Sequence, residues 1–150
     1  MPLSLTFPDG AVREYADATT PLAVAEGISK SLAKKVVAAK VDGQWWDLTR
    51  PLEHGGKFEL VMRDSADGLE VLRHDAAHVL AQAVQELFPG TQVTFGPTVE
   101  DGFYYDFARD EPFSTEDFEK IEKRMREIVD ADLPIVRTVW EKHAAIAHFR

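Results

Sequence analysis

The chain has 150 residues, of which 45% are hydrophobic and 29% charged, as expected of a folded globular protein rather than a disordered one. It contains no cysteine, which excludes disulfides and thiol nucleophiles and leaves a metal site only His and carboxylate ligands. No apolar run has the length of a membrane span, and the N-terminus lacks the pattern of an export signal. We therefore expect a cytoplasmic protein without a membrane segment.

Charge divides the chain into two parts. Residues 1–62 carry seven Lys and Arg against eight Asp and Glu, whereas residues 63–150 carry ten against eighteen. This asymmetry favours two structural units. The net charge of -9 also argues against non-specific attraction to nucleic acid, because that attraction depends on neutralising phosphates.

The first part of the chain is typical of a small sheet with one helix. Pro8-Asp9-Gly10 is a turn between two alternating stretches, and Asp42-Gly43 is a strong hairpin signal. Thr20 followed by Pro21 marks the start of a helix. The order of these elements predicts a sheet wrapped on a helix, with two strands expected before the helix, at 3–7 and 11–15, and three after it, at 36–41, 45–48 and 58–62.

The second part changes to helical periodicity. Residues 63–68 are polar and are predicted to be a linker. From Leu69 to Leu87 apolar residues recur at helical spacing, which predicts a long amphipathic helix that ends before Pro89.

Two further helices are expected downstream. Ser114 and Asp117 have the spacing of a capping box, and Glu141 begins a third helix that runs to Arg150 without a stop signal. We therefore expect the chain to end inside a domain. Strands are predicted at 91–95, 103–107 and 135–139.

His74 and His78 form an HxxxH pair on the long helix. Four positions advance a helix by about 400°, so both imidazoles project from one face, one turn apart. This face points away from the leucine stripe, beside Ala77 and Ala81, where two imidazoles can form the floor of a polar cleft and exchange protons near neutral pH. From the spacing alone, two solvated histidines without a function on an exposed face are the favoured alternative. A metal site is less favoured, because two histidines are too few for zinc.

An aromatic strand follows the long helix. Alternation places Phe103, Tyr105 and Phe107 on one face, and Tyr104 and Asp106 on the other. One face belongs to the core and the other can line a site, although the pattern alone favours aromatic packing. The chain has no GxGxxG, GxxxxGK[ST], HExxH or GxSxG motif.

Several motifs together resemble the bacterial threonyl-tRNA synthetase family. In residues 1–62, LTFPDG, VDGQWWDL and GGKFELV resemble a TGS domain, a ubiquitin-like β-grasp module. In residues 69–150, RHDAAH, FGPTVEDGFYYDF and FEKIEKRMREIV resemble that family's second additional domain, which is shared with alanyl-tRNA editing proteins. The order of TGS, RHxxAH and GFYYD is specific to this family.

The resemblance implies an α+β fold, with a β-grasp domain at 1–62, a linker at 63–68 and a partial editing domain at 69–150 whose HxxxH helix lies on a sheet. The family's enzyme attaches threonine to tRNA(Thr) using ATP, and its editing domain hydrolyses misacylated seryl-tRNA(Thr). By this resemblance His74 and His78 match the two editing histidines, and Tyr105 matches an editing-pocket tyrosine.

The resemblance also implies partners and limits. The acceptor end of tRNA(Thr) is the expected partner. ATP, zinc and homodimer formation belong to the family's catalytic core, whose segments are not in this sequence, so no cofactor is expected here and the chain alone is expected to be inactive. The alternative is a non-catalytic regulatory module that binds RNA or protein.

Overall fold

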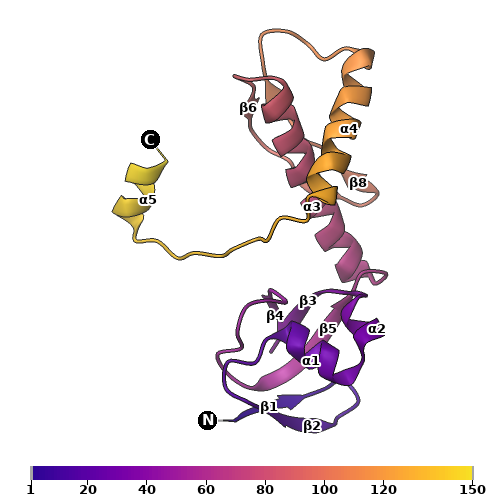
Figure 1. Ribbon diagram of the computed structural model, residues 1–150, viewed down its shortest axis with the longest axis vertical. Coiled ribbons are helices and arrows are strands. Elements are labelled where there is room, and N and C mark those ends of the chain that lie inside the picture. Colours follow the sequence, from indigo (N-terminus) through magenta and orange to yellow (C-terminus); the bar gives the residue numbers. More distant parts are fainter. Residues whose placement is uncertain (1, 150) are drawn as a thin grey trace.

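The computed structural model describes residues 2–149, which form a sheet unit and a helical unit connected by one long helix (Figure 1). The sheet unit contains β1 (Leu3–Thr6), β2 (Val12–Tyr15), α1 (Pro21–Ile28), α2 (Lys30–Ala33), β3 (Val36–Val41), β4 (Gln44–Trp46) and β5 (Gly56–Met62). The rest contains α3 (Ala66–Leu87), β6 (Gln92–Val93), β7 (Thr98–Val99), β8 (Gly102–Phe103), β9 (Phe107–Ala108), α4 (Thr115–Asp130) and α5 (Lys142–His148).

The five strands of the first unit form one mixed sheet in the order β2-β1-β5-β3-β4. Strands β1 and β5 are parallel, and all other neighbours are antiparallel. Parallel neighbours need a crossover connection between them. Here the connection from β1 to β5 contains α1, which lies between the β1–β2 and β3–β4 hairpins in sequence and packs on the sheet. This is the β-grasp arrangement, so the α+β class is confirmed, and the five expected strands occur in the expected order, with a short second helix, α2, in addition.

Local signals explain why these residues form these elements. The Thr20 hydroxyl accepts a hydrogen bond from the backbone N–H of Ala23, with Pro21 in the first turn of α1. Asp42 and Gly43 both have positive φ, 49° and 80°, as a two-residue type I′ hairpin requires. One apolar core holds the unit together, formed by Leu3, Leu5, Val24, Ala39, Val41, Trp46, Leu52 and Phe58.

Helix α3 begins earlier than expected. Its first residue is Ala66, so the second half of the predicted linker 63–68 is already helical. The Ser65 hydroxyl caps the helix by accepting from the backbone N–H of Gly68 at 3.1 Å. The polar composition of this segment thus reflects a helix cap and not a free connection.

Two contacts join the start of α3 to the sheet. Lys40 on β3 donates to the carboxylate of Asp67 at 2.6 Å, and this hydrogen bond is the main reason why the pKa of Lys40 lies above its ordinary value. Gly68 lies against the end of β5, where a Cβ would overlap the carbonyl oxygen of Met62. The absence of a side chain at Gly68 therefore allows the close approach of α3.

The second unit has a separate core between α3 and α4. Ala83 and Val84 of α3 and Ile121 of α4 are buried, and aromatic side chains from the connecting segment pack against them. The sheet expected beneath the long helix is smaller than predicted. Only β6 pairs with β9 and β7 with β8, so the predicted strands 91–95 and 103–107 are mostly loop.

The predicted strand at 135–139 is wrong. These residues have no regular structure, and Ile135 and Val136 are 88% and 74% exposed. A strand needs a neighbour to satisfy its backbone groups, and none of the described strands lies beside this segment. The helix predicted from 141 is present as α5, which lies apart from α3 and α4 at the end of an extended segment (Figure 1).

The capping box of α4 gives a prediction for acid stability. The carboxylate of Asp117 accepts from the backbone N–H and the hydroxyl of Ser114, both at 2.9 Å, and pairs with Lys120. Chiefly through the Ser114 N–H, these donors lower the pKa of Asp117 to about 2. Since the folded pKa is depressed, this stabilisation is complete above the unfolded pKa of about 4 and is lost as the pH falls towards 2.

Asp117→Asn is therefore expected to lower the thermal midpoint of the chain at neutral pH, with a difference from the parent that shrinks below about pH 3. Circular dichroism at 222 nm across an acid titration measures this. Glu119→Gln, an exposed acid on the same helix, is the matched control. A difference that stays constant between neutral pH and about pH 2 would contradict the role of the Asp117 charge.

Candidate active site

The two histidines of the HxxxH motif lie on α3 and contact each other directly. Nε2 of His74 and Nε2 of His78 are 3.0 Å apart, and the ring planes are inclined by 70°. One ring must donate its Nε2–H and the other must accept it, because two bare or two protonated nitrogens would repel. Both residues are exposed, so solvent and ligands can reach the pair.

The buried face of α3 lies closer to the histidines than the leucine pattern predicted. Leu69 and Leu72 are 45% and 42% exposed, whereas Ala77, Ala81 and Val84 are buried. Ala83, which belongs to the expected stripe, is also buried, so the buried face covers part of that stripe and extends roughly 60–120° from Leu69 towards the histidine side of the helical wheel. The histidine pair flanks the packed face of the helix and does not stand on the opposite side.

Tyr105 approaches the histidines from the segment between β8 and β9. His78 and Tyr105 line the same open hollow, of about 460 Å³, whose other walls are Ala81, Gln82, Gln85, Glu86 and Val93. His74 does not line this hollow and is connected to it only by its hydrogen bond to His78. The structure thus places His78 and Tyr105, which are 27 residues apart in the sequence, at one hollow, with His74 in contact with His78.

The comparisons with known proteins concern the first unit and the chain as a whole. Residues 4–62 match the family described as the TGS domain. The chain is 66% identical to a threonine–tRNA ligase of Hyphomonas neptunium over 148 residues, which are 99% of this chain and 22% of that protein. Relatives of the same name from Phenylobacterium zucineum and Maricaulis maris are 59% and 61% identical, over 99% and 98% of this chain and 22% and 23% of theirs.

The chain is homologous to the N-terminal part of threonine–tRNA ligases. It spans about a fifth of the length of these curated relatives. The recognition made from the TGS-like, RHxxAH and GFYYD motifs is confirmed. Among residues 2–149, no helix is long and apolar enough to span a membrane.

An ion-pair network fixes one wall of the hollow lined by His78 and Tyr105. Glu86 accepts from Arg124 of α4 at 2.6 Å and from Gln82 at 2.9 Å. The bond to Arg124, followed by that to Gln82, lowers the pKa of the Glu86 carboxyl, which therefore stays ionised near neutral pH. The lining of the hollow thus includes a carboxylate held by two hydrogen-bonded partners, a feature that the sequence pattern did not reveal.

Arg73, next to the first histidine, anchors the loop that faces α3. Its Nη1 donates to the backbone carbonyl of Glu100 at 2.6 Å, and the carbonyl of Val99 lies at 3.5 Å. This contact ties the turn between β7 and β8 to the histidine helix. Asp75, by contrast, lines a different hollow with Leu72, on the side of α3 that faces α4.

The described residues do not form a metal centre. Among residues 2–149, no three His, Asp or Glu side chains lie close enough to hold an ion, so His74 and His78 have no third ligand. Protein zinc sites use three or four ligands, and two imidazoles do not fit such a site. The chemistry of the hollow is therefore derived from the side chains themselves.

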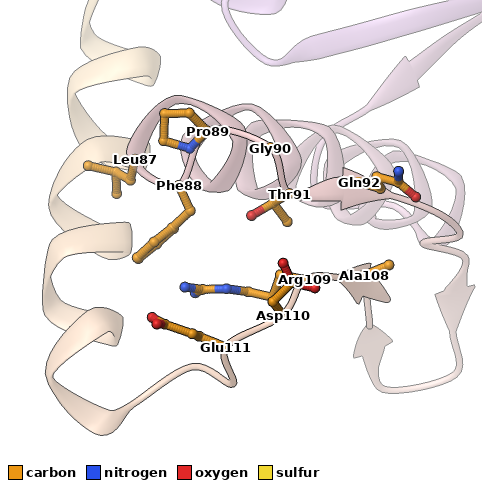
Figure 2. Close-up of a pocket in the computed structure, with 10 residues that line it drawn as sticks. All are labelled: Leu87, Phe88, Pro89, Gly90, Thr91, Gln92, Ala108, Arg109, Asp110 and Glu111. Atoms are coloured by element: carbon orange, nitrogen blue, oxygen red, sulfur yellow. The ribbon is translucent and has the colours of Figure 1, made fainter.

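A wider hollow, of about 750 Å³, lies at the C-terminal end of α3 (Figure 2). The guanidinium of Arg109 lies 4.5 Å from the ring centroid of Phe88 and 4.6 Å from that of Phe113. Its Nη1 is buried without a hydrogen-bond partner among the described residues. None of the candidate site residues lines this hollow, and its Arg109 packs in the aromatic cluster that closes the end of the α3–α4 core.

Proposed function

We propose that the chain is part of a threonine–tRNA ligase that attaches threonine to tRNA(Thr) using ATP, and that its second unit is part of an editing site for seryl-tRNA(Thr). The names of the relatives support the first statement. The second is supported by one observation, the hollow lined by His78 and Tyr105, whose His78 is hydrogen-bonded to His74.

The need for such a site follows from the two amino acids. A synthetic pocket that accepts threonine through its hydroxyl group also admits serine, which differs by one methyl group. The missing methyl changes binding by only about 1–3 kcal/mol, which limits discrimination to roughly 10–200-fold. A second site that hydrolyses the wrong product supplies the remaining selectivity.

The geometry of the histidine pair suits this hydrolysis. The ring that donates its Nε2–H to the other ring has a bare Nδ1, because a neutral imidazole carries one hydrogen. That Nδ1 can take a proton from the attacking water while the ring keeps its hydrogen bond to the neighbour. Water adds to the ester carbonyl carbon, the bond to the ribose oxygen breaks, and the proton passes to that oxygen, giving serine and free tRNA(Thr).

Each residue has a proposed role. His74 positions or deprotonates the water at the terminal ribose, His78 orients His74 through the Nε2 contact, and Tyr105 positions the aminoacyl group. The acceptor end of tRNA(Thr) is the proposed partner. ATP, zinc and the homodimer contacts are proposed to belong to the remainder of the enzyme.

The test measures release of serine from seryl-tRNA(Thr), with threonyl-tRNA(Thr) as the competing substrate. It compares the chain with a form extended to the length of the relatives, each with and without His74→Ala. We expect the extended form to hydrolyse seryl-tRNA(Thr) selectively, the chain alone to be inactive, and His74→Ala to reduce the rate of the extended form by about 10²–10⁴-fold.

The rival function is a non-catalytic module in which the β-grasp unit binds RNA or protein. The separate core of that unit is compatible with this rival. If the extended form hydrolyses seryl-tRNA(Thr) no faster than buffer, or if His74→Ala leaves its rate unchanged, the editing proposal fails. Binding of tRNA(Thr) that persists in such an inactive protein would then favour the rival.

A further inference from the structure

Gly96 lies directly against the ring of Tyr105. A Cβ built at Gly96 would overlap Cδ2 and Cε2 of the tyrosine ring and would lie 2.7 Å from its Cγ. Contacts below 3.0 Å are not found for real Cβ atoms, so any side chain at this position requires the ring to move. The φ angle of Gly96 lies outside the left-handed region, and the backbone itself would accept alanine.

The surroundings hold both partners of this contact in place. The backbone N–H of Asp106 donates to the carbonyl of Phe95 at 2.8 Å, and the Thr94 hydroxyl donates to the carbonyl of Asp106 at 2.6 Å. These bonds join the residues before Gly96 to the residue after Tyr105, so the glycine cannot simply withdraw from the ring.

A second ring restricts the tyrosine further. The ring of Phe107 stacks on that of Tyr105, with centroids 5.1 Å apart and planes inclined by 21°. Phe107 is itself packed against the α3–α4 core and is not free to follow a displaced ring. The ring position beside His78 is therefore set by the missing side chain of Gly96 together with the stack on Phe107.

We propose that Gly96 is a positioning residue of the candidate active site, whose lack of a side chain sets where the Tyr105 ring stands in the hollow that it shares with His78. This inference rests on the proposed editing function for its catalytic readout. It makes Gly96 a determinant of how the aminoacyl group is held, because a misplacement of about 1 Å can cost up to 10²-fold in rate.

The experiment compares Gly96→Ala with Gly102→Ala. Gly102 lies in the same connecting segment, has no positive φ, and has open space where its Cβ would stand, so it controls for the loss of a glycine. In the form active on seryl-tRNA(Thr), we expect Gly96→Ala to lower kcat/KM by roughly 10–100-fold and Gly102→Ala to change it less than about twofold.

A double-variant comparison shows whether Gly96 acts through Tyr105. In a Tyr105→Ala background there is no ring to displace, so adding Gly96→Ala is expected to cause no further loss of kcat/KM. Any drop in melting temperature that Gly96→Ala causes by itself is expected to be absent when Gly96→Ala is added to Tyr105→Ala, because no ring then overlaps the new Cβ. A full additional loss in this background would overturn the proposal.

Nuclear Overhauser effects between the rings of Tyr105 and Phe107 in the chain itself give a readout that is independent of catalysis. They are expected to weaken in Gly96→Ala and to persist in Gly102→Ala. If they are unchanged in Gly96→Ala, the positioning role is wrong. If they weaken but Tyr105→Ala itself does not slow hydrolysis, the proposed role of the tyrosine in editing fails, while the steric control of its ring by Gly96 stands.

Discussion

His74→Ala, His78→Ala and the variant with both substitutions are expected to lose nearly the same share of seryl-tRNA(Thr) hydrolysis, about 10²–10⁴-fold each. The reason is the 3.0 Å contact between the two Nε2 atoms. Each ring fixes the tautomer and orientation of the other. If either ring is removed, the remaining imidazole loses the hydrogen bond that sets its tautomer and orientation. Residues that act as one unit give losses that do not multiply.

Initial rates of serine release for the parent and the three variants of the extended form measure this coupling. His143→Ala is the matched control, because His143 is also an exposed histidine on a helix but lies on α5. It is expected to stay within about twofold of the parent. Losses that multiply in the double variant would mean that the two imidazoles act independently, which would contradict the shared-proton arrangement.

The β-grasp unit could be predicted from the sequence because its signals are local. Thr20-Pro21 starts a helix and Asp42-Gly43 closes a hairpin through contacts within a few residues, and both are found as expected. Ser65 and Asp67 also carry a local signal. Their polarity predicts a linker, whereas in the structure Ser65 caps α3 and Asp67 anchors it to Lys40. Composition alone does not distinguish a helix cap from a connection.

The second unit was less predictable because its structure depends on distant partners. The strand pattern at 135–139 has the right residues but no neighbouring strand among those described. The leucines of α3 follow the expected spacing, yet Leu69 and Leu72 are exposed, and the core with α4 and the aromatic segment forms around Ala83 and Val84. Periodicity identifies the helix, while tertiary contacts decide which side is buried.

In the candidate site, too, the features that depend on local geometry could be predicted and those that depend on distant contacts could not. The i,i+4 spacing was enough to predict that His74 and His78 share a face, because helix geometry is local. His78 and Tyr105 line one hollow although 27 residues separate them in the sequence. The motif resemblance suggested that they share a site, whereas residue spacing alone could not. Nothing in the sequence indicates that a Cβ at Gly96 would meet the Tyr105 ring, because that contact depends on the tertiary structure.

Phe58→Ala is expected to unfold the β-grasp unit and to leave the helices of the second unit largely formed. Phe58 is 1% exposed and packs edge-on against Phe7 within the core of the first unit. Removing a buried phenylalanine costs about 3–5 kcal/mol. A unit of about 60 residues has roughly 3–9 kcal/mol of stability in total, so this loss takes most or all of it.

The second core does not contain Phe58, being formed around Ala83, Val84 and Ile121. Urea unfolding of a Trp140→Phe background separates the two units, because the remaining tryptophans, Trp45 and Trp46, both lie in β4. We expect their fluorescence midpoint to fall by more than about 1 M urea, or the transition to be lost, while the helical signal at 222 nm moves much less.

Phe118→Ala is the matched control, because the side chain of Phe118 on α4 is 55% exposed and lies outside the β-grasp core. It is expected to leave the tryptophan transition unchanged. If Phe58→Ala shifted the fluorescence and the helical signal equally, the contacts at Lys40–Asp67 and Gly68 would be strong enough to make both units unfold together. The sheet would then act as a structural support for the histidine helix and not as a separate module.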